Sequence, residues 1–108
     1  MNMESITGRV ATDPTARVMK DGTMRSQFFI QDKQDVYFHV SCYRELAEGA
    51  AAFLKTGALV TVRGKCKIEE WIDHNDIKHW QTRILAIRIQ ILDPIESNHT
   101  EVEDQALG

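Results

Sequence analysis

The sequence contains few of the residue types and segments that mark specialised classes of protein. Among its 108 residues are only two cysteines, two prolines and six scattered glycines. No apolar run approaches the roughly 20 residues of a membrane-spanning helix. The opening residues lack the basic start and the apolar stretch of a signal peptide. We therefore expect one small domain that has no membrane association and resides in the cytoplasm.

The two cysteines, Cys42 and Cys66, fall on the apolar side of two strand-like segments, where small buried hydrophobic residues are common. A disulfide between them is disfavoured in a reducing compartment. His39 and Cys42 would point to opposite faces of one strand, and no pair of ligands has the spacing of a zinc site. The sequence therefore predicts no disulfide and no metal site.

Groups arranged for catalysis are also lacking. The four serines lie in no nucleophile-elbow context, and the glycines form no phosphate-binding loop. Glu69 and Glu70 adjoin each other on a predicted strand, so their carboxylates would point apart and make a poor acid–base pair. We expect a protein that is not an enzyme, has no catalytic residues and uses no cofactor.

The charged residues are distributed unevenly along the chain. The formal net charge of −3 argues at first against a nucleic-acid partner, yet residues 93–108 hold five of the sixteen acidic residues and no lysine or arginine. Residues 1–92 carry the 13 basic residues and 11 acidic ones, a net charge of +2. We therefore predict a mildly basic domain over 1–92, followed by a short, acidic and flexible tail over 93–108.

The hydrophobic pattern predicts five strands and one helix. The predicted strands cover residues 5–10, 24–31, 37–43, 59–71 and 78–92, with a short continuation of the first strand at 17–19. Helical spacing of apolar residues over 45–55 places the helix between the third and fourth strands. The parity of the last strand slips at 85–87, which indicates a β-bulge or a strand buried on both sides.

This order of elements is that of the OB-fold, a five-stranded, partly open Greek-key barrel with a helix between strands 3 and 4. The predicted fold class is therefore all-β with one helix. A generic α+β sandwich fits the same string of elements and remains the alternative on pattern alone.

Alternation along the strands separates an apolar side from a side rich in rings and cations. In the third strand Val36, Phe38, Val40 and Cys42 form the apolar side, and in the fourth Val60, Val62, Gly64, Cys66 and Ile68 do so. The outward positions combine cations, which neutralise phosphates, with aromatic rings, which stack on unpaired bases. Together with the two tryptophans beside the turn at 73–76, the candidate nucleic-acid-binding residues are Arg9, Arg25, Phe29, Tyr37, His39, Tyr43, Arg63, Lys65, Lys67, Trp71 and Trp80.

Each of these residues taken alone is more simply explained as ordinary protein surface, because exposed aromatic pairs stabilise sheets without any ligand. The recurrence of the same parity in three strands favours binding. Trp71 and Trp80 flank a polar turn, where they would clamp a nucleic-acid strand, although Trp80 would equally serve to cap the core. His39 would contact a phosphate or fill the space between two tyrosines.

Several short motifs occur in order over about residues 5–92, and they include Gly8-Arg9-Val10, Asp21-Gly22-Thr23, Phe28-Phe29-Ile30, Phe53-Leu54-Lys55-Thr56-Gly57 and Leu59-Val60-Thr61-Val62-Arg63-Gly64. In this order and spacing they resemble the bacterial single-stranded DNA-binding proteins, the SSB family. The resemblance implies an OB-fold that binds single-stranded DNA without sequence preference, usually as a homotetramer, with a dimer as the alternative. It also implies that Tyr37, Tyr43 and Trp71 occupy positions of base-stacking residues.

The resemblance further implies a cytoplasmic, nucleoid-associated protein that protects single-stranded DNA in replication, recombination or repair. The chain departs from the family at Arg44-Glu45, where Gly-Lys is typical, and in lacking the acidic C-terminal tip that ends in Pro-Phe. Recruitment of replication or repair proteins through that tip is therefore not expected. An alternative function is that of a primosomal or accessory OB-fold protein acting mainly through protein partners such as a helicase.

Overall fold

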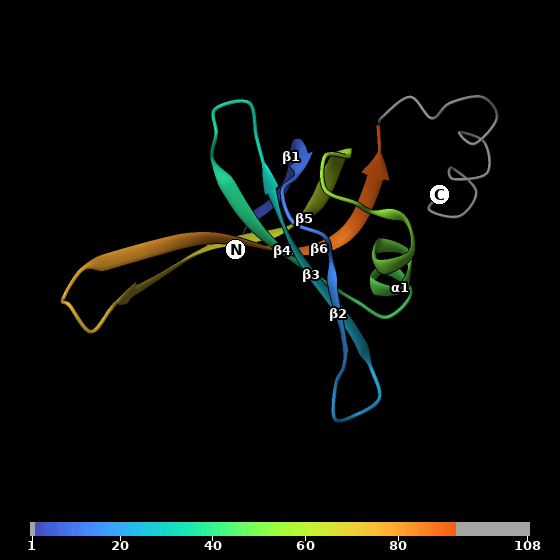
Figure 1. The fold of residues 1–108 in the computed structure, drawn as a ribbon, viewed down its shortest axis with the longest axis horizontal. Helices are drawn as coiled ribbons and strands as arrows, with labels where there is room; N and C mark the ends of the chain where they lie inside the picture. Colours follow the sequence, from blue (N-terminus) through green and yellow to red (C-terminus); the bar gives the residue numbers. More distant parts are fainter. Residues whose placement is uncertain (1, 93–108) are drawn as a thin grey trace.

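The computed structural model describes residues 2–92, which form a closed barrel with one long hairpin projecting from it (Figure 1). The predicted tail over 93–108 lies outside the described residues. The elements in chain order are β1 Asn2–Val10, β2 Thr15–Val18, β3 Met24–Gln31, β4 Tyr37–Tyr43, α1 Arg44–Phe53, β5 Leu59–Ile72 and β6 Lys78–Ile91. None of the helices in this part of the chain has the length and apolar character needed to cross a membrane.

Five of the strands close the barrel. The sheet order is β1-β5-β6-β4-β3-β2, and an additional pairing of β1 with β3 completes the ring. The pairing of β4 with β6 is parallel, whereas the other pairings are antiparallel. The segment predicted as a continuation of the first strand is instead a separate short strand, β2, which pairs with β3 outside the ring.

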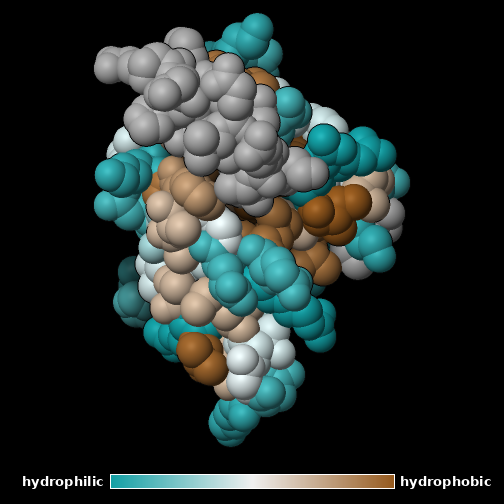
Figure 2. Space-filling model, turned by 90° about the vertical axis from the view of Figure 1, so that its right-hand side faces the viewer, coloured by the Kyte–Doolittle hydropathy of each residue, from teal (hydrophilic) through white to brown (hydrophobic). Residues whose placement is uncertain are grey.

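The core consists of the inward side chains of the barrel strands and of α1. Phe28, Ile30, Val40 and Val62 are fully buried, as their parity predicts. Helix α1 covers the barrel through Ala47 and Ala50, and the buried hydroxyl of Ser26 donates a hydrogen bond of 2.8 Å to the Ala47 carbonyl oxygen. On the side of α1, the surface mixes hydrophobic and hydrophilic residues (Figure 2).

Two residues predicted to face the core lie outside it. Val36 belongs to the turn between β3 and β4, and Ile68 is 65% exposed because β5 extends past the barrel at this point. Alternation predicts on which side of a strand a residue lies. It does not predict where along the strand the barrel ends. Beyond that point, a side chain on the inward side of the strand is exposed to solvent.

The predicted β-bulge is confirmed between β5 and β6. Arg63 pairs with Arg88 while Gly64 pairs with Ala86, so Ile87 is the extra residue. A Cβ atom on Gly64 would lie 2.1 Å from the Leu85 carbonyl oxygen. Glycine at this position therefore allows the two strands to approach at the bulge.

Beyond the bulge, β5 and β6 continue together, and past the last β6 residue paired with β4 they form the projecting hairpin, drawn in yellow to orange in Figure 1 and here called the arm (residues 69–81). Its closing turn, Asp73–Ile77, repeats the turn Asp32–Val36 between β3 and β4. In both turns the first aspartate accepts two backbone N–H hydrogen bonds and the second aspartate has a positive φ, 62° and 61°. Both hairpins therefore end in the same compact, polar turn.

Candidate nucleic-acid interface

Four adjacent strands, β3, β4, β6 and β5, carry the outward surface on which most of the candidate residues lie. Cross-strand pairing places Phe29 opposite His39, His39 opposite Arg83, and Arg83 opposite Lys67. These four residues form one row across the sheet, here called the central row. Two aromatic or imidazole rings and two cations therefore lie side by side on one face, as parity predicts for three of them.

Hydrogen bonds hold the central row in place. The Arg83 guanidinium donates to Glu69 Oε1 at 2.8 Å and to His39 Nδ1 at 3.0 Å. The His39 ring meets Phe29 edge to face, with 5.0 Å between the ring centroids. Burial, and then the charges of Arg83 and Arg25, lower the pKa of His39. His39 is thus a neutral acceptor that helps to orient Arg83.

A groove of about 300 Å³ lies beside the central row. Lys65 and Lys67 of β5 and Tyr43 of β4 contribute to its walls. Its complete lining is Ser41, Tyr43, Lys65, Lys67, Arg83, Ile84 and Leu85. Tyr43 is 37% exposed, so its ring is accessible next to two ammonium groups and a guanidinium. This combination of a flat ring and cations suits a base with its neighbouring phosphates.

Trp71 lies on the arm, on the same face as Lys67 and Glu69, and is 44% exposed. Its indole stacks on the His79 ring, with 5.4 Å between centroids and 19° between planes. His79 Nε2 in turn lies 2.7 Å from Asp73 Oδ2 in the closing turn. The hydrogen bond to His79, the first of several causes, lowers the pKa of Asp73. Trp71 is therefore held in a fixed orientation at the end of the surface.

Trp80 does not share the surface that Trp71 occupies. It pairs with Glu70, so it lies on the opposite face of the arm, where it is 66% exposed. It therefore does not cap the barrel core. The register across the closing turn places the two tryptophans on opposite sides of one hairpin, so they do not face each other.

The remaining candidates are spread around the edge of the surface. Tyr37 pairs with Gln31, which also pairs with Arg9 where β1 meets β3. The Arg9 guanidinium donates to the Gly57 carbonyl oxygen at 3.0 Å. Arg25 lies directly opposite Tyr43. Tyr37 and Arg9 therefore lie near the first residue of β4, and Arg25 lies near its last.

Arg63 is separated from Lys65 and Lys67, although the three alternate along one strand. Its guanidinium donates to Ser5 Oγ at 3.3 Å, and it lines a different hollow of about 270 Å³ together with Arg88. The β-bulge lies between Arg63 and Lys65 along the pairing of β5 with β6. Of the three cations predicted to share one surface, Lys65 and Lys67 line the groove and Arg63 lies apart from them.

Sequence reasoning missed Arg83 and Leu85, which line the groove. A signal for both was present. The burial of Ile84 and Ala86 follows from their apolar character, and their neighbours on the same strand must then point outward. The parity slip at the bulge obscured this pattern in the last strand.

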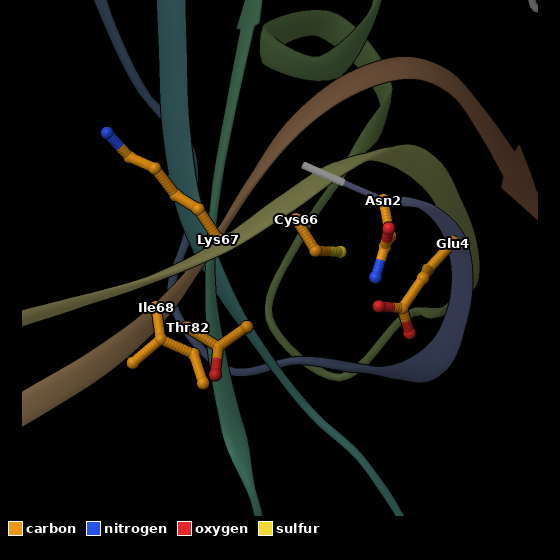
Figure 3. A pocket seen from close by; sticks show the side chains of 6 residues that line it. All are labelled: Asn2, Glu4, Cys66, Lys67, Ile68 and Thr82. Atoms are coloured by element: carbon orange, nitrogen blue, oxygen red, sulfur yellow. The ribbon is translucent and has the colours of Figure 1, made fainter.

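A further hollow of about 490 Å³ lies where the arm leaves the barrel (Figure 3). Its lining consists of Asn2, Glu4, Cys66, Lys67, Ile68 and Thr82. In Figure 3 the Lys67 side chain points away from Asn2 and Glu4, toward the other side of β5. Burial and the Glu4 carboxylate raise the pKa of the Cys66 thiol, which disfavours a reactive thiolate. No cluster of metal-ligating side chains occurs within residues 2–92.

The chain has relatives among known proteins. The chain is similar to the single-stranded DNA-binding proteins of Caldanaerobacter subterraneus subsp. tengcongensis, 27% identical over 87% of this chain and 69% of the relative, and of Thermosynechococcus vestitus, 26% identical over 85% and 82%. The crystal structure of the small single-stranded DNA-binding protein from Streptomyces coelicolor is 24% identical and superposes with a TM-score of 0.69 over 84% of this chain and 94% of that chain. This likeness confirms the predicted OB-fold. The family model described as Single-strand binding protein family matches residues 1–92, and the chain therefore belongs to that family.

Proposed function

We propose that this protein binds and protects single-stranded DNA without base-sequence preference. The observation that carries the proposal is the groove in which the Tyr43 ring lies beside Lys65, Lys67 and Arg83. Rings stack on any unpaired base, while cations neutralise phosphates, which carry no sequence information. The function is binding without a catalytic step. The family match gives no support to the alternative of an accessory protein acting mainly through a helicase or another protein partner.

Within this function, Tyr43 and Trp71 stack on bases, and Lys65 and Lys67 bind phosphates. The central row extends the surface across His39 and Phe29, and Tyr37 lies on the same side of β4, two residues before His39. Arg9, Arg25 and Arg63 lie at the margins, and their contribution is electrostatic. Trp80, on the opposite face of the arm, contributes least.

Fluorescence titration with oligo-dT tests the proposal. Stacking on Trp71 quenches indole emission, and the binding constant falls as salt rises, with a slope of about −0.7 per phosphate contacted on a plot of log K against log salt. Emission from a Trp80→Phe variant reports Trp71 alone. If oligo-dT leaves that emission unchanged at low ionic strength and no complex forms, the proposed function is wrong.

One edge of β1 favours an assembly of several copies. From Asn2 to Gly8, β1 pairs with β5 only, so its other edge is unpaired among the described strands. Such an edge is a template for pairing with a second chain. We propose a homo-oligomer, with a tetramer favoured over a dimer, that coats DNA in the cytoplasm during replication, recombination or repair. Size-exclusion chromatography with light scattering gives the number of copies.

A further inference from the structure

Tyr43 lines two hollows. One is the groove with Lys65, Lys67 and Arg83. The other is a hollow of about 530 Å³ between the β2–β3 turn and the start of α1, here called the second hollow. Its lining consists of Met19, Lys20, Asp21, Thr23, Tyr43 and Arg44. A DNA strand with a base stacked on Tyr43 could therefore continue into both hollows.

Arg44 has an unusual backbone conformation in this hollow. Its φ of 59° lies in the left-handed region, which favours glycine and is rarely occupied by an L residue with a long side chain. The position connects β4 directly to α1, so the conformation is imposed by the fold. An arginine tolerated at a position that favours glycine indicates that its side chain has a use. That side chain forms part of the wall of the second hollow.

The charges around the second hollow favour an anion. Lys20 and Arg44 are cations, and the cross-strand series Tyr43, Arg25, Arg17 places two more cationic residues on the adjoining face. Asp21 is the opposing charge. Its Oδ1 accepts a hydrogen bond of 2.9 Å from the Thr23 backbone N–H, so this carboxylate has a structural role in the turn.

We propose that the second hollow is a phosphate-binding subsite, in which Arg44 and Lys20 hold the backbone of a single strand that crosses Tyr43 from the groove of Lys65 and Lys67. This inference rests on the proposed function and adds the path of the strand. The path runs from the arm, along β5, over the end of β4 and onto the β2–β3 turn. Each cation in the subsite neutralises one phosphate and releases its counterions.

Arg44→Gly tests the subsite and preserves the fold, because glycine adopts a φ of 59° without steric cost. We expect oligo-dT to bind about twofold to fivefold more weakly, as for an exposed ion pair. The salt slope should become shallower by about 0.7, and by about 1.4 when Lys20→Ala is added. The melting temperature should equal or exceed that of the unsubstituted chain, which separates lost binding from lost folding.

Asp21→Asn gives the converse result at the same place. Its amide oxygen still accepts from the Thr23 N–H, but the negative charge is removed, so oligo-dT should bind more tightly. The matched control is Lys55→Ala, which removes a cation beyond the other end of α1 and should leave the salt slope unchanged.

The two proposals fail in different ways. If the unsubstituted chain binds oligo-dT but Arg44→Gly and Lys20→Ala leave both affinity and salt slope unchanged, the subsite is wrong and the proposed function stands. An effect of Lys55→Ala as large as that of Arg44→Gly would also overturn the subsite. It would show that Arg44 acts only through the net charge of the protein, without contacting the DNA. Absence of binding by the unsubstituted chain overturns the function itself.

Discussion

Tyr43 is the residue that the groove and the second hollow share, and a substitution there gives the sharpest test of stacking at the residue scale. Tyr43→Ala removes the ring and should weaken oligo-dT binding by about 1–3 kcal/mol. Tyr43→Phe keeps the ring and should bind nearly as well as the unsubstituted protein. Fluorescence titration at fixed salt measures both. Equal losses in the two variants would indicate that the hydroxyl, and not stacking, is responsible.

The two tryptophans should behave differently, because they lie on opposite faces of the arm. Trp71→Ala should weaken binding by about 1–3 kcal/mol, since its ring lies on the face that carries Lys67. Trp80→Ala removes an equally large ring that is more exposed, and it should leave the affinity nearly unchanged. The pair is measured by anisotropy of a labelled oligo-dT. Equal losses would show that DNA contacts both faces.

His39 makes the stability of the domain depend on pH. Burial, followed by the charges of Arg83 and Arg25, lowers its pKa below the ordinary value of 6.5, and the Glu69 carboxylate opposes this shift. The unfolded chain then binds the proton more readily than the folded one. The contribution of neutral His39 is present above about pH 6.5 and is lost as the pH falls through the folded-state value.

We therefore expect the free energy of unfolding of the unsubstituted chain to fall more steeply than that of His39→Asn between about pH 7.5 and about pH 5.5. Urea denaturation at each pH gives both values. Because the two proteins differ only at residue 39, the difference between the two curves isolates His39. Parallel curves would rule out the assigned protonation state.

At the scale of elements, the close approach of β5 and β6 depends on Gly64. Gly64→Ala places a Cβ atom 2.1 Å from a backbone carbonyl oxygen, which no side-chain movement relieves. We expect a loss of about 3 kcal/mol in unfolding free energy. Gly22→Ala is the control, since its φ of 88° is unfavourable for alanine but nothing lies within 4 Å, and it should cost only about 1 kcal/mol. Thermal or urea unfolding ranks the two.

Most elements follow from local pattern alone. Alternation predicts the strand at 24–31, and the change to helical spacing predicts the helix, which begins at Arg44 and ends at Phe53. The bulge is also predicted from the sequence, because an extra residue in the last strand reverses the alternation of apolar and polar positions. Local pattern does not predict how the strands close into a barrel. The pairing of β1 with β3 and the separate strand β2 depend on contacts between segments distant in sequence.

The candidate site is predictable to a similar degree, residue by residue. Parity brings Tyr43, Lys65 and Lys67 to one face, and the structure places them in one groove. Parity also assigns Arg63 to that face, yet Arg63 lies on the other side of the bulge and lines another hollow. The opposed positions of Trp71 and Trp80 depend on the register across the turn, which the sequence does not reveal. No hydrophobic pattern marks Arg44, because it lies where strand alternation gives way to helical spacing.

At the scale of the whole molecule, charge and core are separated along the chain. The buried core of the described residues extends from Val10 to Ile89, whereas five acidic residues and no basic ones lie in 93–108. A chain ending at Leu92 should therefore melt close to the temperature of the full chain. It should also bind oligo-dT more tightly at low salt, with the difference shrinking as added salt screens the charges.

Calorimetry and salt-dependent titration of the shortened and full chains test this separation. A markedly lower melting temperature would show that the domain does not end near residue 92. Equal affinities at low salt would show that the acidic residues do not act on the binding surface.

The two matching turns, Asp32–Val36 and Asp73–Ile77, have a consequence for how this molecule can change. Since the same turn closes a short hairpin and the long arm, the turn does not determine hairpin length. Inserting two residues into each arm strand would carry Trp71 outward by about 7 Å and keep it on its face. Inserting one residue into each would turn it to the opposite face. The reach of the arm can therefore evolve in steps of two residues per strand, leaving the turn and the barrel unchanged.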